Sequence, residues 1–176
     1  MRDKRDLRLF FALWPDEVIR RQLQRQALSL AIDRDARRVP EYNLHLTLHF
    51  IGNIPRVGLD CLQQRAREVI AEPFVVEIDE TGSFVKPKVA WLGCREMPVA
   101  LDRLHQDLGK RLRGCGFKPE KRRFNPHVTV ARKISSPPPA PTLEPVIWPV
   151  DRFALIESRA DQNGVKYWPI EEYYLT

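Results

Sequence analysis

The sequence predicts an α+β fold built from two similar lobes, because one strand–helix–strand pattern occurs twice along the chain. In the first half, a strand over 7–13, a helix and a strand over 44–51 follow one another. The second half repeats this order with strands over 89–94 and 127–132. The proline that opens each helix precedes the histidine of the next strand by 30 residues in the first half and by 29 in the second. We therefore expect a pseudo-twofold axis within one domain over 1–176.

The elements of the first half follow from hydrophobic spacing and from helix-start signals. The apolar, aromatic segment 7–13 is typical of a buried strand. Pro15 and the two acidic residues after it indicate the start of a helix. Strict alternation predicts a strand over 44–51 that is broken by 52–55, and a second amphipathic helix follows over 57–71. The apolar residues that recur at helical spacing in the first helix are Val18, Ile19, Leu23, Ala27, Leu30 and Ala31.

The second half contains one more helix and most of the strands. Pro98 opens a helix that ends near Gly114 and Gly116 and carries leucines at helical spacing. The segment 135–149 holds six prolines and is expected to be a surface loop. A turn at 86–88 and a hairpin turn at Asn163-Gly164 separate neighbouring strands. The strands are expected over 74–84, 89–94, 127–132, 153–158 and 167–175.

The composition is that of a soluble globular protein, with 43% hydrophobic and 30% charged residues. There are 29 Lys and Arg residues against 23 Asp and Glu residues, so the net charge is +6. A positive net charge of this size indicates an anionic partner or serves only to keep the protein soluble. Composition alone does not distinguish these two explanations.

The cysteines and the hydropathy pattern indicate a cytoplasmic location. Cys61, Cys94 and Cys115 are odd in number and lack C-x-x-C spacing, which predicts reduced thiols. The apolar run 9–14 is shorter than the core of a signal peptide, and Pro15 follows it directly. No apolar stretch approaches the length of a membrane span, so we expect no membrane partner.

One short motif occurs in both halves of the chain, once in each of two alternating strands. The motif reads His45-Leu46-Thr47-Leu48 in the first half and His127-Val128-Thr129-Val130 in the second. Side chains alternate between the two faces of a strand, so each histidine shares a face with its threonine. A single motif of this kind is of little value, but two copies at matching offsets predict that the pairs face one another across a cleft.

Two opposed imidazoles and two hydroxyl groups suit displacement at phosphorus. Imidazoles with a pKa near 6.5 serve as general acid and general base around neutral pH. Threonine hydroxyls donate hydrogen bonds to non-bridging phosphate oxygens and stabilise the charge that develops there. A strained cyclic phosphodiester requires no metal for this reaction, and we expect neither a metal site nor a cofactor.

Three stretches of the sequence resemble the two-histidine phosphoesterases, in particular the bacterial RNA 2′,3′-cyclic phosphodiesterases of the 2′-5′ RNA ligase family. The stretches are Arg8–Leu13, Asn43–Gly52 and Arg123–Arg132, and the resemblance extends over nearly the whole chain in motif order and length. It implies a bilobal α+β fold in which two antiparallel sheets form a central cleft with the helices outside.

The resemblance also implies roles for the motif residues. His45 would be the proton donor, His127 the proton acceptor, and Thr47 and Thr129 would hold the phosphate. His49 stands where the family usually has a lysine. No metal or nucleotide cofactor is implied.

Other residues are weaker candidates for substrate contact. Arg123 lies near the entrance to the second motif strand, whereas Arg132 points away from His127 on a regular strand and would pair with a carboxylate unless the strand bends. Tyr42 and Phe10 are candidates for base stacking, although aromatic residues in strands usually belong to the core.

Two further histidines lie outside the motif pair. His49 is expected on the face of His45, about 13 Å away along a strand and hence too far to share one metal ion. His105 is expected at the surface or in helix packing. The basic run 118–123 is usually a solvated loop, but beside a phosphate site it would guide RNA.

The sequence thus predicts hydrolysis of an RNA-terminal 2′,3′-cyclic phosphate to a 2′-phosphomonoester. The expected partners are RNA ends or nucleotides that bear this cyclic phosphate, with no obligate protein partner. Two alternatives stay open. One is 2′-5′ RNA ligation by the reverse chemistry, and the other is a non-catalytic RNA-binding module.

Overall fold

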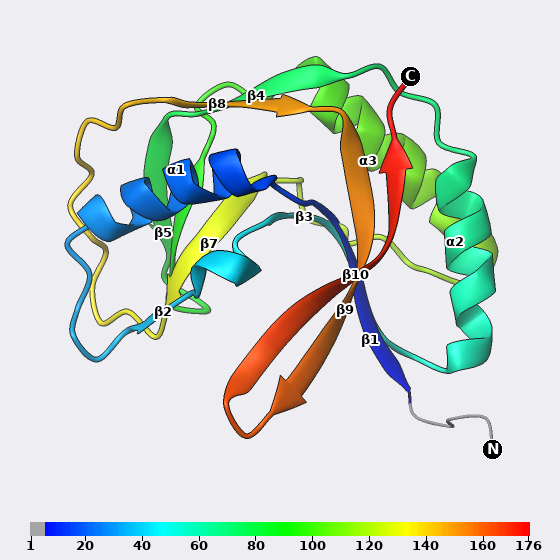
Figure 1. Ribbon diagram of the computed structural model, residues 1–176, viewed down its shortest axis with the longest axis horizontal. Helices are drawn as coiled ribbons and strands as arrows, with labels where there is room; N and C mark the ends of the chain where they lie inside the picture. Colours follow the sequence, from blue (N-terminus) through cyan, green and yellow to red (C-terminus); the bar gives the residue numbers. More distant parts are fainter. Residues whose placement is uncertain (1–5) are drawn as a thin grey trace.

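The computed structural model describes residues 6–176, in which three helices lie among ten strands along the chain (Figure 1). The strands are β1 (Leu7–Leu13), β2 (Arg37–Arg38), β3 (Leu46–Ile54), β4 (Phe74–Ile78), β5 (Glu80–Phe84), β6 (Val89–Gly93), β7 (His127–Arg132), β8 (Val146–Val150), β9 (Arg152–Asp161) and β10 (Gly164–Tyr174). The helices are α1 (Glu17–Ser29), α2 (Leu59–Arg67) and α3 (Val99–Leu112), with short 3-10 turns η1 (Glu41–Asn43), η2 (Arg56–Gly58) and η3 (Arg113–Cys115).

The strands form two antiparallel sheets, which confirms the predicted α+β class. The large sheet has the order β10-β9-β1-β3-β7-β6-β5, with β2 paired to β7, and the small sheet is β4-β8. A single residue pair, Leu46 with Val128, joins β3 to β7 at the centre of the large sheet. Each partner directly follows a motif histidine, so this pair brings the two motifs together.

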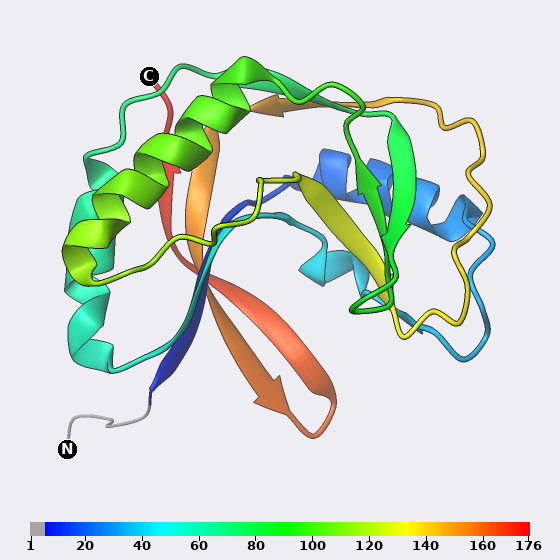
Figure 2. The ribbon, with the colours of Figure 1, turned by 180° about the vertical axis from the view of Figure 1, so that it is seen from behind.

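The main core lies between the large sheet and the elements that cover it. Helices α2 and α3 pack together beside β1 and β9, whereas α1 lies on the side of β5 and β7, and the small sheet spans the top of the molecule (Figures 1 and 2). In α1 the carboxylate of Asp16 accepts the backbone N–H of Ile19 at 2.8 Å, and this cap begins the helix where the sequence predicts it. A second, small cluster lies on the opposite face of the sheet and contains Phe10, Ala12, Ala154 and Ile156.

Several element boundaries differ from the prediction. The segment 74–84 is two strands in different sheets, because β4 pairs with β8 and β5 pairs with β6. The strand that carries the first motif continues through Gly52 to Ile54, because Gly52 adopts a φ of 84° beside a bulge and the pairing to β1 continues. The second helix is shorter than 57–71. The proline-rich segment 135–149 is a loop only as far as β8, where Pro149 occupies a strand position.

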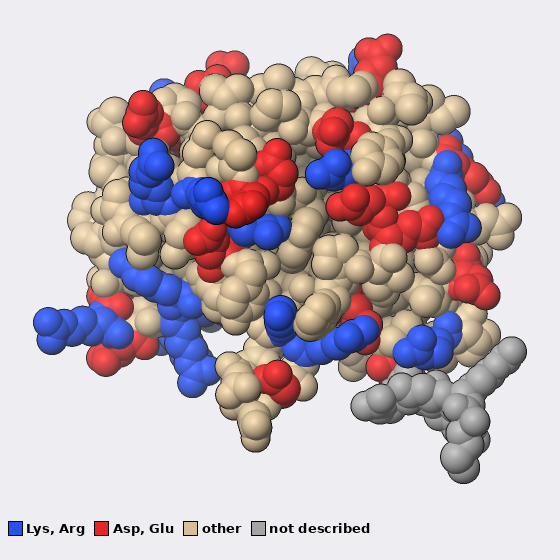
Figure 3. Space-filling view, in the orientation of Figure 1, with Lys and Arg blue, Asp and Glu red and all other residues tan. Residues whose placement is uncertain are grey.

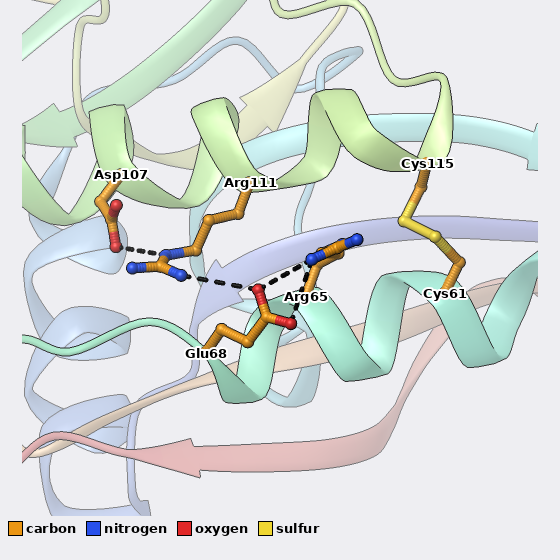
Figure 4. A network of polar contacts seen from close by, with 6 residues as sticks. All are labelled: Cys61, Arg65, Glu68, Asp107, Arg111 and Cys115. Atoms are coloured by element: carbon orange, nitrogen blue, oxygen red, sulfur yellow. Dashed lines mark hydrogen bonds and ion pairs between the residues drawn. A yellow bond between two sulfur atoms is a disulfide. The ribbon is translucent and has the colours of Figure 1, made fainter.

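The prediction of three reduced cysteines is wrong, because a disulfide joins Cys61 of α2 to Cys115 of η3 (Figure 4). Cys94 is a free thiol. The two bonded cysteines are 54 residues apart and meet only because α2 packs beside the end of α3. The carboxylate of Glu68 lies between Arg65 and Arg111 where α2 packs against α3 (Figure 4).

Within residues 6–176 no helix has the length and apolar character that crossing a membrane requires.

Candidate active site

His45 lies between η1 and β3, where a backbone carbonyl orients its imidazole. The Nδ1 atom lies 2.7 Å from the carbonyl oxygen of Asn43. A carbonyl oxygen only accepts hydrogen bonds, so Nδ1 carries the proton and Nε2 of the neutral ring has a lone pair. The hydroxyl of Thr47 lies 3.0 Å from this Nε2 and donates to it. The first motif therefore presents one imidazole nitrogen and one hydroxyl at the same point.

His127, the first residue of β7, is held in the same way. Its Nδ1 donates to the carbonyl oxygen of Asn125 at 2.7 Å, which leaves Nε2 as the acceptor. The ring of Phe84 packs edge-on against the imidazole, with the ring centroids 5.0 Å apart. The two motifs thus present their histidines in the same tautomer.

The asparagine two residues before each histidine belongs to the site, although the sequence prediction assigned it no role. Asn43 is buried, and its side chain donates to the carbonyl oxygen of Val165 and accepts from the backbone N–H of Tyr167, so it pins η1 to β10. The ring of Tyr167 then lies edge-on to His45, with the centroids 5.1 Å apart. The sequence did contain a signal for these asparagines, because the repeat in the two halves is the longer motif Asn-x-His-x-Thr.

A β-bulge in β3 moves His49 away from His45, so the prediction that they share a face is wrong. Thr47 pairs with Ala12 and His49 pairs with Phe11, which leaves Leu48 without a partner. Directly opposed residues lie on the same face of a sheet, so Thr47 and His49 lie on opposite faces. The imidazole of His49 is 5% exposed, and its Nε2 donates to the carbonyl oxygen of His105 in α3 at 2.8 Å.

A matching bulge in β7 brings Arg132 into the cleft. Thr129 pairs with Trp91 and Arg132 pairs with Val89, which leaves Val130 as the additional residue. Arg132 therefore shares a face with Thr129, contrary to the expectation for a regular strand. Among the side chains of residues 6–176, no carboxylate forms an ion pair with Arg132.

The two motifs meet in a cleft of about 470 Å³. His45, Thr47, His127 and Thr129 all line it, as do Arg123 and Arg132. Two of the residues that were predicted to contact the substrate, Phe10 and Tyr42, do not line the cleft. Phe10 is 2% exposed and packs beneath His45 in the small cluster, and Tyr42 is 50% exposed outside the cleft, with the Nζ atom of Lys166 5.6 Å from its ring. Phe10 lies in β1 and Tyr42 in η1, and the sequence alone does not show which surface either ring faces.

The cleft is strongly cationic. Lys86, Arg122, Arg123 and Arg132 line it, against one carboxylate, Glu120, which pairs with Arg122 at 3.1 Å. On the face of the molecule drawn in Figure 3, by contrast, acidic and basic side chains are interspersed over most of the surface, with Lys and Arg gathered near β2. A larger cavity of about 580 Å³ over α3 contains neither motif pair. The cleft, rather than the larger cavity, therefore combines proton carriers with an anion-binding surface.

Burial keeps both motif histidines neutral. The pKa of His45 is lowered to about 4, mainly by burial; the hydrogen bond to the Asn43 carbonyl opposes the shift, and the nearby Arg132 and His127 act in the same direction as burial. Burial also lowers the pKa of His127, and Arg132 adds to the effect. Both rings therefore offer an unprotonated Nε2 near pH 7. A phosphate in the cleft would favour protonation of either ring, because its negative charge opposes these shifts.

A metal ion has no ready set of ligands in the part of the chain that the structure describes. No group of three or more His, Cys, Asp or Glu side chains within residues 6–176 is placed to hold one. His49 and His105 stack with their centroids 4.1 Å apart, and the Nε2 atom of His49 is used in its bond to α3.

Comparison with known proteins shows similarity to one family over most of the chain. Residues 15–162 match the 2′-5′ RNA ligase superfamily. The RNA 2′,3′-cyclic phosphodiesterase of Escherichia coli (strain K12) is 30% identical over 173 residues, which cover 96% of this chain and 97% of that protein. The structure of E. coli LigT in apo form has a TM-score of 0.84 at 29% identity and covers 98% of this chain and 99% of that one. The same protein complexed with 3′-AMP has a TM-score of 0.86, with 97% and 99% covered.

Proposed function

Because this chain belongs to the 2′-5′ RNA ligase superfamily, we propose that it hydrolyses the 2′,3′-cyclic phosphate at RNA ends to a 2′-phosphomonoester. One observation carries the proposal: two neutral imidazoles and two threonine hydroxyls line the same cationic cleft. The similar E. coli protein is named for this activity, and the structure of E. coli LigT with 3′-AMP supports a nucleotide as the ligand of the fold.

In the proposed reaction His127 is the general base and His45 the general acid. Nε2 of His127 takes a proton from water as the water oxygen bonds to phosphorus. The bond from phosphorus to the 3′ oxygen breaks, and that oxygen receives the proton held on Nε2 of a protonated His45. The product carries the phosphate on its 2′ oxygen, and proton exchange with solvent restores the starting state. Because His45 is neutral in the empty cleft, the charge of the bound phosphate raises its pKa before it can act as the acid.

Thr47, Thr129 and Arg132 would stabilise the phosphate oxygens. In the empty cleft the hydroxyl of Thr47 donates to Nε2 of His45. Protonation of this nitrogen turns it into a donor, so the hydroxyl is released to donate to a phosphate oxygen instead. Thr129 holds the corresponding position in the second motif, and the guanidinium of Arg132 would bind the charge that builds up on phosphorus.

The proposal is tested by single changes of the two histidines, His45→Ala and His127→Ala. Each variant should hydrolyse an end-labelled oligonucleotide with a 2′,3′-cyclic phosphate more slowly, by a factor on the order of 100 to 10,000, because each loses one proton transfer. The assay contains EDTA, and the product is identified as a 2′- or 3′-phosphate by chromatography. Wild-type rates in both variants would contradict the proposed mechanism, and loss of wild-type activity in EDTA would contradict a metal-independent reaction.

The family description also favours ligation as a second candidate, in which a 5′-hydroxyl takes the place of water. The same two histidines would serve, and the large excess of water favours hydrolysis. Product analysis with and without a 5′-hydroxyl acceptor separates the two reactions. A non-catalytic RNA-binding module would instead show salt-dependent binding that survives loss of both histidines.

A further inference from the structure

The two carbonyl oxygens that orient the motif histidines are supported in different ways. Asn43 is buried, and its side chain forms hydrogen bonds to the backbone of Val165 and Tyr167 in β10. Asn125 is exposed, and its side chain forms no hydrogen bond to any residue that the structure describes. The second asparagine therefore does not anchor itself, although its carbonyl oxygen lies 2.7 Å from Nδ1 of His127.

The loop that carries this asparagine also lacks support from the backbone. The loop 118–126 belongs to no helix or strand and leads from the end of α3 toward β7 (Figure 2). Within the described chain, no backbone group of this loop forms a hydrogen bond to another backbone group. Because the loop contributes Arg123 and Asn125 to the wall of the cleft, side-chain contacts have to hold it in place.

Aromatic rings at the two ends of the loop provide such contacts. Phe124 stacks on the imidazole of His105 in α3, with the centroids 3.8 Å apart and the planes 6° apart. His105 stacks in turn on His49 at 4.1 Å. Phe117, directly before the loop, lies edge-on to His49 at 5.4 Å. The stacked pair of histidines therefore contacts one ring at each end of the loop.

The pair is suited to this packing because both rings are neutral and one of them is fixed. Nε2 of His49 donates to the carbonyl oxygen of His105 at 2.8 Å. Burial lowers the pKa of His105 to about 4 and also lowers that of His49, so neither ring is charged near pH 7. Among residues 6–176, no group hydrogen-bonds to the ring nitrogens of His105. Its contact with Phe124 thus depends on a flat ring and not on a particular nitrogen.

We propose that His105 is a positioning residue for the general base His127. By stacking on Phe124, it fixes the carbonyl oxygen of the neighbouring Asn125, and that oxygen orients the imidazole. The proposal rests on the proposed function only in naming His127 as the base. Without a fixed acceptor at Nδ1, the proton of the neutral ring is distributed over both nitrogens. A ring that carries its proton on Nε2 cannot take one from water.

The test is His105→Ala, studied by kinetics and by NMR of the imidazole nitrogens. In wild type, the rings of His45 and His127 should both carry the proton on Nδ1 at pH 7. In the variant His127 should become a mixture of the two tautomers, whereas His45, supported through β10, should not change. On an oligonucleotide with a 2′,3′-cyclic phosphate, kcat should fall on the order of tenfold or more. KM should stay within a few-fold of wild type, because the motif threonines remain on their strands.

Three further variants separate positioning from a general loss of stability. His105→Phe retains a flat ring without nitrogens and should return kcat and the His127 tautomer to near wild type. Gln106→Ala is the matched control, because Gln106 follows His105 in α3 and lines the same cavity but takes no part in the stack. Leu101→Ala removes a buried contact of α3 away from the loop, so it should lower the melting temperature without changing the tautomer.

The proposal is overturned if His127 keeps its proton on Nδ1 in His105→Ala, which would show that the rigid Pro126 is enough to hold Asn125. It is also overturned if His105→Phe is as impaired as His105→Ala. If wild type hydrolyses no cyclic-phosphate RNA, the proposed function fails, while the NMR comparison still decides whether His105 positions His127.

Discussion

Asn43 and Asn125 orient the two histidines through main-chain carbonyl oxygens rather than through carboxylates. A carboxylate would hold positive charge on the imidazole, whereas a carbonyl fixes the tautomer without adding a full charge. With burial and Arg132 both lowering their pKa values, the two histidines remain neutral in the empty cleft. In the proposed mechanism, the general acid therefore depends on the charge of the substrate phosphate to become protonated.

Replacing Arg132 with glutamine should move the pH–rate profile to higher pH. Arg132 lowers the pKa of both His45 and His127, so its removal raises both values. The acid limb of kcat/KM reports the group that must be unprotonated, and the alkaline limb reports the group that must be protonated, so both limbs should shift the same way. The pKa values of His45 and His127, measured by NMR titration, should also rise.

Arg132→Lys is the control for this prediction, because it retains the positive charge and should leave the limbs near their wild-type positions. The glutamine variant should also be slower at its own optimum, since it lacks a cation for the phosphate. A profile that keeps its position while the rate falls would show that Arg132 acts on the phosphate alone.

At the scale of the element, two β-bulges decide which residues of the motif strands face the cleft. Both follow the motif threonine by one residue, at Leu48 in β3 and at Val130 in β7. In β3 the bulge sends His49 into the interior against α3, and in β7 it sends Arg132 into the cleft. The helix that receives His49 has a glycine at the contact, because a Cβ atom on Gly109 would lie 2.9 Å from the imidazole.

Gly109→Ala should destabilise the protein although alanine is the better helix former. In an open helix the change would stabilise by about 1 kcal/mol. Here the added methyl group would overlap the buried ring of His49, and overpacking of this kind costs about 1–3 kcal/mol. The free energy of unfolding is measured by urea denaturation monitored by circular dichroism.

The double variant His49→Ala/Gly109→Ala provides the decisive comparison. Once the ring is absent, alanine at 109 should no longer destabilise, and relative to His49→Ala alone it should be neutral or stabilising. Equal effects of Gly109→Ala in the presence and absence of His49 would rule out the steric contact as the cause.

At the scale of the whole molecule, the disulfide ties distant parts of the chain together. Along the chain, Cys61 lies in α2, which follows the first motif strand β3 and precedes β4. Cys115 lies in η3, which follows α3 and precedes the second motif strand β7. The ion pairs of Glu68 with Arg65 and Arg111 lie along the same helix contact (Figure 4). They are partly exposed and contribute little by themselves. The covalent bond is the stronger constraint on how α2 and α3 pack.

Reduction of this disulfide should lower the free energy of unfolding by about 2–4 kcal/mol, because it closes a long loop in the unfolded chain. Cys61→Ser/Cys115→Ser should lose a similar amount without reductant and should then be insensitive to it. Cys94→Ser is the control, because its thiol is free and the variant should still respond to reductant. A wild-type protein whose stability is the same with and without dithiothreitol would contradict the prediction.

The sequence by itself determined the α+β class, the bounds of β1 and β7, the three helices and the two His-x-Thr motifs, because these depend on local spacing and on helix and turn signals. Family membership followed from the same stretches. Only the tertiary structure decided the faces of His49 and Arg132, the joining of the motifs through Leu46 and Val128, the burial of Phe10, and the Cys61–Cys115 bond. Each of these depends on cross-strand register or on contacts between distant segments, and alternation along one strand does not contain that information.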